Sequence, residues 1–170
     1  MKKGIKQVLF YVVLIAIVVV VCAMLLRQES VGMIDSDVIV AFENGEIKTG
    51  FYSPHSHRVI HCPDCLLQPQ EFSTITELFR KWINDNNITV YSEEIGMGLI
   101  RHLYLRKAFG TGEIMVCVVI NGAALPHADS LIESLKGVSG FKSLIVNINR
   151  QKTNVVLGET SEAIYGEDFI

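Results

Sequence analysis

Two cysteines separated by a Pro-Asp dipeptide, with histidines close by, form the most metal-like cluster in this sequence. The cysteines are Cys62 and Cys65, and His55 and His57 precede them. Zinc takes four ligands, commonly thiolates and imidazoles, and a two-residue spacer lets both thiolates face one ion. The sequence has no second Cys or His pair with such spacing, so His55 and His57 would have to complete a zinc site. Two free thiols in a turn are the alternative.

A second group of residues could contact nucleic acid. No acidic residue occurs between Gly96 and Gly112. Alternation along a strand places four residues on one face, namely Ile100, His102, Tyr104 and Arg106. A tyrosine beside such donors could stack on an unpaired RNA base and hydrogen-bond to it. A solvated strand, or a face covered by another domain, is the alternative. The RNA-contact candidates are Arg101, His102, Tyr104, Arg106, Lys107, Arg150 and Lys152.

Charge limits the strength of any RNA contact. Residues 31–170 carry 11 Lys and Arg against 17 Asp and Glu, a net charge of −6. A domain with this net negative charge has no extended basic surface, so we expect weak RNA contact through a local basic patch. The three cysteines of this part are an odd and sparse set, which indicates a reducing compartment.

The N-terminal residues have a different composition. Residues 8–26 contain no charged side chain, three lysines precede them, and their length approaches that of a bilayer-spanning helix. Together with the lysine excess, this predicts an uncleaved transmembrane anchor over 1–30, with membrane contact through 8–26 and a cytoplasmic N-terminus. A single-pass membrane location follows, with the side of the remaining domain left open.

The elements that must position the candidate residues follow from periodicity and turn signals. Asn44-Gly45 predicts a tight hairpin, and the apolar stripe from Phe72 to Ile83 predicts a helix. The order predicts an α+β, ferredoxin-like β-α-β-β-α-β antiparallel sheet after the anchor. We expect an anchor over 1–30, a hairpin and loop over 31–61 and an α+β domain over 62–170. The predicted strands are 38–42, 46–52, 99–107, 113–120 and 143–149, with a short extended piece at 58–61, and the predicted helices are 71–84 and 128–136.

Several motifs in this order resemble the central region of the bacterial RNA uracil-5-methyltransferases, which act on ribosomal or transfer RNA. The resemblance covers about Asp35 to Ile170 and does not include the N-terminal run. The motifs are Gly50-Phe51-Tyr52 with Ser56-His57, Cys62 to Leu67, Leu99 to Leu103, Thr111 to Val116, Ser143 to Asn149 and Thr153 to Gly158.

This resemblance implies S-adenosylmethionine as the methyl donor of the full-length family. It also makes Cys65 the match of one ligand of the family's iron–sulfur cluster, although a cluster needs about four thiolates and we expect none here. No residue matches the family's cofactor loop, nucleophilic cysteine or general base. We therefore expect a truncated or fused, non-catalytic domain with RNA contact, which associates with a catalytic domain or with itself. A membrane-anchored interaction module without enzymatic activity is the alternative.

Overall fold

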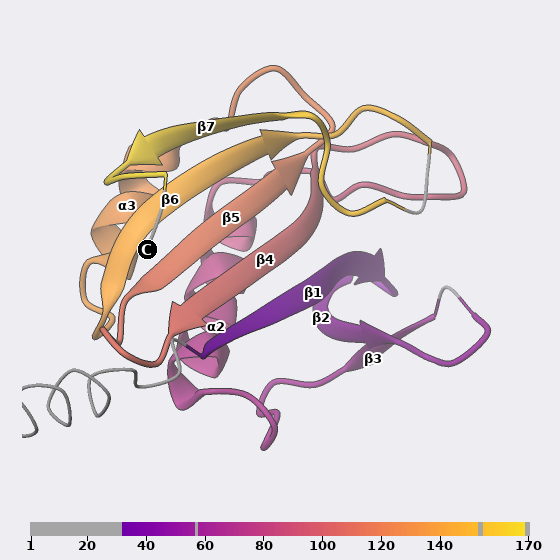
Figure 1. The fold of residues 1–170 in the computed structure, drawn as a ribbon. Coiled ribbons are helices and arrows are strands. Elements are labelled where there is room, and N and C mark those ends of the chain that lie inside the picture. The colour runs from indigo at the N-terminus through magenta and orange to yellow at the C-terminus, as the bar shows by residue number, and fades with distance from the viewer. Residues whose placement is uncertain (1–31, 57, 153–154, 169–170) are drawn as a thin grey trace, which may run out of the picture. The chain divides into compact units, whose positions relative to one another are not determined.

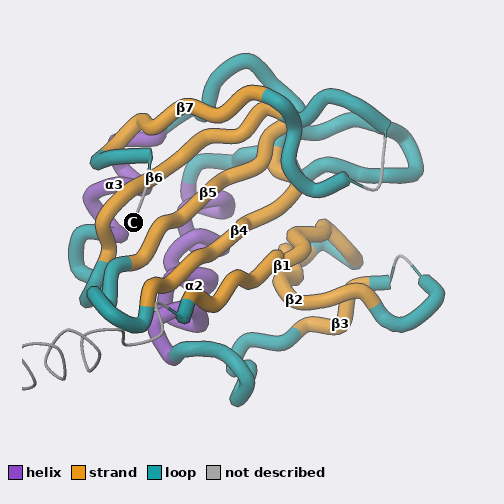
Figure 2. The backbone as a smooth tube through the Cα atoms, in the orientation of Figure 1, coloured by secondary structure: helices purple, strands orange, loops and turns teal. Residues whose placement is uncertain are grey.

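The computed structural model describes residues 32–56, 58–152 and 155–168, and Met33–Ile170 form one compact unit. The described residues of this unit form two helices and seven strands, whose arrangement is drawn in Figures 1 and 2. The strands are β1 (Met33–Glu43), β2 (Glu46–Tyr52), β3 (Val59–His61), β4 (Ile100–Ala108), β5 (Ile114–Ile120), β6 (Phe141–Ile148) and β7 (Thr160–Tyr165). The helices are α2 (Gln70–Asp85) and α3 (Ala128–Leu135).

All seven strands belong to one sheet in the order β3-β2-β1-β4-β5-β6-β7. Every neighbouring pair is antiparallel except β5 and β6, which run parallel. Asn44 and Gly45 join β1 to β2 with positive φ angles of 55° and 85°, as a tight hairpin requires. Because parallel neighbours need a crossover connection, α3 carries the chain from the end of β5 back to the start of β6.

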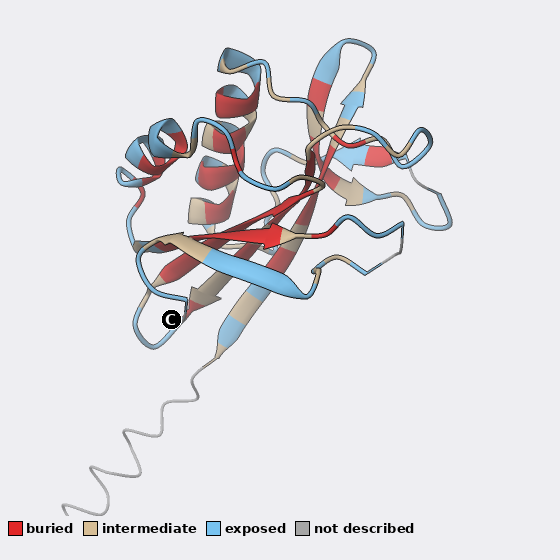
Figure 3. Cartoon of the chain, turned by 90° about the horizontal axis from the view of Figure 1, so that it is seen from above, coloured by how far each residue is buried: buried red, intermediate tan, exposed pale blue. Residues whose placement is uncertain are grey.

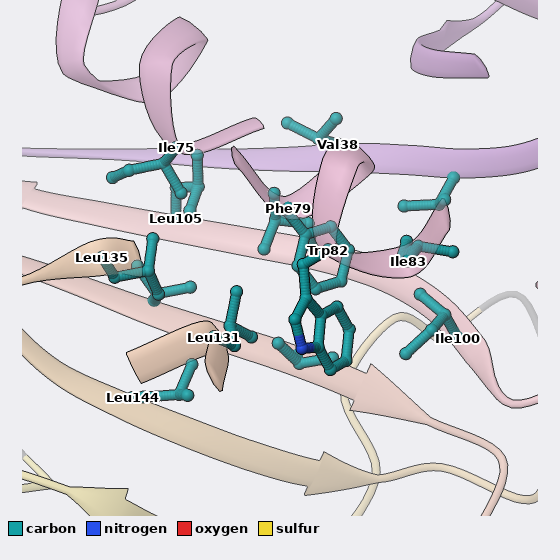
Figure 4. Packing of buried hydrophobic residues seen from close by; sticks show 14 of the residues in the cluster. Val38, Ile75, Phe79, Trp82, Ile83, Ile100, Leu105, Leu131, Leu135 and Leu144 are labelled. Carbon is teal, nitrogen blue, oxygen red and sulfur yellow. The ribbon is translucent and has the colours of Figure 1, made fainter. Parts of the chain in front are cut away.

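Both helices cover the same face of the sheet and build the main core there (Figures 3 and 4). Phe79 and Trp82 of α2 stack with ring centroids 5.4 Å apart. The indole Nε1 of Trp82 donates hydrogen bonds to the His127 carbonyl oxygen (3.0 Å) and to Ser130 Oγ (3.1 Å), which ties α2 to the start of α3. Each fully buried side chain of this size contributes about 1.5–3 kcal/mol through burial. The largest fully buried side chains are Phe72, Phe79, Ile75, Ile83, Ile100, Leu103, Leu105, Ile114, Ile120, Leu131, Leu135 and Leu144.

A smaller apolar cluster lies on the opposite face of the sheet. It consists of Met115, Cys117, Val119 and Ile145, and side chains from β4, β7 and the loop after β6 pack against it. Strand β5 is therefore buried on both faces, as its continuous apolar sequence indicates.

The predicted ferredoxin-like, four-stranded antiparallel sheet is wrong. Strand β1 lies between β2 and β4, and α3 connects two adjacent parallel strands instead of strands separated by a third. Strand β7, which the sequence pattern did not predict at Thr160–Tyr165, adds an edge beside β6. The predicted helices and the hairpin appear at their expected places. The order of the elements along the chain, however, did not predict which strands are neighbours in the sheet.

The transmembrane part of the fold prediction also needs correction. Within the described ranges, no helix is long and apolar enough to cross a bilayer. The predicted anchor over 1–30, including 8–26, lies outside the described residues. The structure thus gives no support to a membrane-spanning helix, and we do not retain the single-pass membrane location derived from it.

Candidate nucleic-acid interface

Arg101, the first candidate RNA-contact residue, is buried and serves as an internal anchor. Its side chain is 1% exposed, and Nη1 donates hydrogen bonds to the carbonyl oxygens of Asn149 (3.0 Å) and Gln151 (2.8 Å). Nη2 lies 3.4 Å from Glu93 Oε1, and the guanidinium stacks over the Tyr91 ring at 4.6 Å from its centroid. Arg101 therefore joins the loop before β4 to the loop after β6 and does not present its charge to a ligand.

The next candidates, on the helix-free face of β4, lie beside acidic side chains of β1. Nδ1 of His102 lies 3.0 Å from Asp37 Oδ1, and Arg106 holds both carboxylate oxygens of Asp35, at 2.7 and 3.0 Å. Arg106 also donates to the Tyr104 hydroxyl at 3.2 Å. The hydrogen bond from Arg106 lowers the pKa of Asp35, so this carboxylate stays charged at neutral pH. Asp35 and Asp37 thus neutralise much of the predicted patch.

Lys107 is paired as well, on the face that the helices cover. Its Nζ lies 2.8 Å from Glu71 Oε1, in the first turn of α2. The expectation that Ile100 shares the face of His102 and Tyr104 is wrong, because a β-bulge between Ile100 and His102 shifts the alternation. Ile100 consequently faces the main core.

The last two candidates, Arg150 and Lys152, are exposed on the loop that follows β6. Nε of Arg150 donates to the Gly122 carbonyl oxygen at 3.2 Å. The Lys152 stem passes close to Gly96, where an added Cβ would lie 2.6 Å from its Cε. Of the seven candidates, these two are exposed cations that form no ion pair with an acidic side chain of the described residues.

Two asparagines of the Ser143 to Asn149 motif hold this loop in place. Asn147 and Asn149 are buried, and the Asn147 side chain accepts a hydrogen bond from Gly158 N (2.7 Å) and donates to Gly158 O (3.0 Å). The Asn149 amide donates to the carbonyl oxygens of Val155 (2.7 Å) and Val156 (3.1 Å). Both asparagines alternate with apolar residues at the end of β6, and this spacing was a usable signal that the two amides share one face of the sheet. Because buried amides must satisfy their donors and acceptors nearby, that face has to supply backbone partners.

Three of the four candidate metal ligands, Cys62, Cys65 and His55, lie among the described residues. Cys62 and Cys65 are partly exposed free thiols, His55 has a left-handed φ of 57° in a turn, and His57 lies outside the described residues. Within the described part of the chain, no group of three or more His, Cys, Asp or Glu side chains is placed to hold a metal ion.

A groove of about 520 Å³ lies on the helix-free face of the sheet. Met115, Cys117 and Ile145 line it together with Tyr104 and Arg106, and three acidic residues near the C-terminal end, Glu162, Glu167 and Asp168, also line it. Burial raises the pKa of the Cys117 thiol to about 12, so it is protonated at neutral pH. The groove thus combines an apolar floor with carboxylates that repel phosphate, and it holds no activated nucleophile among its described lining residues.

The fold of the described residues is also found in a solved structure. It is similar to part of the tRNA (uracil-54, C5)-methyltransferase of Pyrococcus abyssi, crystallised with S-adenosyl-L-homocysteine. The TM-score is 0.62 at 22% sequence identity, over 80% of this chain and 31% of that chain. At this identity the likeness establishes a shared fold.

Sequence relatives then give the family. The chain is 44% identical over 127 residues to an uncharacterised RNA methyltransferase of Caldanaerobacter subterraneus subsp. tengcongensis, and 40% identical over 129 residues to one of Clostridium tetani. These alignments cover 72% and 75% of this chain and 28% of each relative. No protein-family model matches the chain. The chain belongs to this RNA methyltransferase family and corresponds to a minor part of its members' length, which confirms the resemblance predicted from the sequence.

Proposed function

We propose that residues 33–168 form a non-catalytic, RNA-contacting domain of an S-adenosylmethionine-dependent RNA (uracil-5-)-methyltransferase. The relationship to RNA methyltransferases over about three quarters of this chain is the observation that carries the proposal. The chain spans only 28% of these relatives, so a domain that serves a larger enzyme agrees with the coverage.

The described residues do not fit the methyl donor. A dinucleotide-type site places a glycine-rich turn between a strand and the N-terminus of a helix, where backbone N–H groups face the ligand. Here β5 leads to α3 through 121–127, which contains the single Gly122, and His127 caps α3 in a left-handed conformation without a side-chain hydrogen bond. The connection from β5 to α3 therefore does not provide a binding site of this type for S-adenosylmethionine.

Two of the described cysteines, Cys62 and Cys117, do not fit the nucleophile either. Methylation at carbon 5 of uracil, by the route that the family resemblance implies, needs a thiolate that attacks the ring and a base that later removes the proton. Burial keeps the Cys117 thiol protonated, and desolvation raises the pKa of Cys62. Neither thiol has the electropositive surroundings that activate a catalytic cysteine.

RNA contact is best supported at the loop after β6. Arg150 and Lys152 project there from backbone that Arg101, Asn147 and Asn149 hold with buried hydrogen bonds. A cation on a fixed loop loses less conformational entropy when it binds a phosphate than one on a loose segment. Two such contacts give weak, salt-dependent binding, as the net negative charge of the domain requires.

The proposal predicts which lysines and arginines affect RNA binding. Binding of the chain to a fluorescent single-stranded, uridine-containing oligoribonucleotide is measured by anisotropy at several salt concentrations. The double variant Arg150→Ala/Lys152→Ala should bind more weakly, and the magnitude of its slope of log affinity against log salt should fall by about 1.4, at roughly 0.7 for each lost phosphate contact.

The matched control removes two exposed lysines on the helix side, Lys81→Ala/Lys136→Ala, which pair with Asp85 and Glu133. This variant should bind RNA as the parent chain does. An equal loss of affinity in both double variants would show that binding follows total charge and would reject the proposed loop.

A further inference from the structure

The groove of about 520 Å³ on the helix-free face of the sheet has an apolar floor. Met115 and Cys117 from β5 and Ile145 from β6 form this floor, and each of them is less than a tenth exposed. Leu157, which is 41% exposed, lines the groove as well. Both described helices cover the opposite face of the sheet (Figure 3), so neither of them packs on this floor.

The charge of the groove is negative. Glu162, Glu167 and Asp168 line it, are exposed, and form no ion pair with a cationic side chain of the described residues. Arg106 is a cation that also lines the groove, but its guanidinium is held by Asp35 at 2.7 and 3.0 Å. The three carboxylates beside the apolar floor are therefore not neutralised by any described cation.

We propose that this groove binds a cationic and apolar segment of a partner protein. Leucine-like side chains of the segment lie on the floor formed by Met115, Cys117 and Ile145, and its lysines or arginines lie beside Glu167 and Asp168. Opposite charges on the two facing surfaces favour such a partner, whereas phosphate groups are repelled. The inference concerns a different surface from the RNA-contact loop and does not rest on the proposed function.

Recognition needs both the floor and the carboxylates. Ion pairs between exposed side chains contribute little by themselves, and salt weakens them further. Burial of one leucine side chain, in contrast, changes an affinity by about tenfold or more. A segment that is only basic should therefore bind weakly, and one that is apolar but acidic should be repelled.

The test measures the binding of fluorescein-labelled hexapeptides to the full chain by fluorescence anisotropy. The probe alternates lysine and leucine, and two comparison peptides replace either every leucine by serine or every lysine by glutamate. The lysine–leucine peptide should bind at least about tenfold more tightly than either comparison peptide, and more weakly as the salt concentration is raised. Equal affinity for the lysine–serine peptide would reduce the groove to a general acidic surface and would overturn the proposal.

A pair of charge variants tests the role of the carboxylates in the groove. Glu167→Gln/Asp168→Asn should weaken binding of the lysine–leucine peptide by about threefold or more. The matched control, Glu94→Gln/Asp64→Asn, changes two exposed carboxylates outside the groove and should bind as the parent chain does. All these chains share residues 1–31, so peptide binding to that part is the same in each of them. Equal losses in both variants would contradict the proposal.

Two further measurements locate the apolar part of the contact. Leu157→Ser should weaken binding of the lysine–leucine peptide by about threefold or more, whereas Ile95→Ser, at an exposed apolar position outside the groove, should not. With a diazirine analogue of leucine in the probe, photo-cross-links should fall on Met115, Ile145 or Leu157. Cross-links confined to the 90–97 loop or to residues 1–31 would overturn the proposal.

RNA as the occupant of the groove gives a different result. Binding of the uridine-containing oligoribonucleotide should not fall in Glu167→Gln/Asp168→Asn, because this change removes charges that repel phosphate. A loss of RNA affinity together with an unchanged affinity for the lysine–leucine peptide would assign the groove to RNA and reject the partner proposed here.

Discussion

At the scale of single residues, most of the predicted RNA-contact side chains are engaged inside the domain. Their partners lie far away in sequence: Asp35 is 71 residues from Arg106, and Glu71 is 36 residues from Lys107. A stretch without acidic residues therefore did not mean a surface without acidic residues. Arg101 is the clearest case, because its charge stabilises backbone carbonyl groups that would otherwise be buried without donors.

Arg101→Met should destabilise the domain strongly. The change removes the donor of the buried Asn149 carbonyl oxygen and a hydrogen bond from a charged group to the Gln151 carbonyl oxygen. A buried polar group left unsatisfied costs about 1–3 kcal/mol, and a hydrogen bond to a charged group contributes about 1.5–3 kcal/mol. We expect the free energy of unfolding, measured with urea, to fall by roughly 2–4 kcal/mol. Arg150→Met, at an exposed position on the same loop, is the control and should change it by no more than about 0.5 kcal/mol. Similar values for both variants would contradict the anchoring role of Arg101.

At the scale of elements, the close approach of two backbone segments decides where the loop before β4 lies. Gly98 has a φ of +112°, and a Cβ at this position would collide with the backbone of Val90 and Tyr91. That contact keeps the 90–98 loop folded back on the start of β4, where Tyr91 N donates to the Ile100 carbonyl oxygen at 2.7 Å. The loop carries Glu93 and supports the stem of Lys152, so its shape affects the candidate interface.

Gly98→Ala should therefore cost about 1–3 kcal/mol of stability through backbone strain, and more if the collision is not relieved. Amide hydrogen exchange at Tyr91 should become faster in this variant. Gly110→Ala is the matched control, because a Cβ there meets nothing within 4 Å and its φ is not positive. The control should leave stability unchanged or raise it by about 0.4–1 kcal/mol. If Gly110→Ala proved as harmful as Gly98→Ala, the effect would not come from the close approach.

At the scale of the whole molecule, the described residues form a seven-stranded sheet with helices on one face, and the chain corresponds to a minor part of its relatives. The chain covers 28–33% of three RNA methyltransferases to which it is similar. Its sheet ends in two edge strands, β3 and β7, and its helix-free face carries a groove. The described residues therefore share one main core, on the face of the sheet that both helices cover (Figure 3).

The purified chain should transfer no methyl group. Incubated with labelled S-adenosylmethionine and total RNA, it should leave uridine unlabelled at the background of a heat-denatured sample. The reason is that the described residues provide neither a fitting donor site nor an activated thiol. Incorporation of label into uridine, above that background, would reject the non-catalytic assignment.

The sequence by itself determined the family and most of the local elements. Ordered motifs such as Leu99 to Leu103 and Ser143 to Asn149 predicted the relationship, and the Asn44-Gly45 turn and the α2 stripe predicted their elements, because these signals depend on residues close together in the chain. Only the tertiary structure decided strand order, the parallel β5–β6 pair and the pairing of the β4 cations, because these depend on contacts between distant segments. A bulge of one residue was enough to move Ile100 from the predicted face into the core, and periodicity alone carries no signal for such a shift.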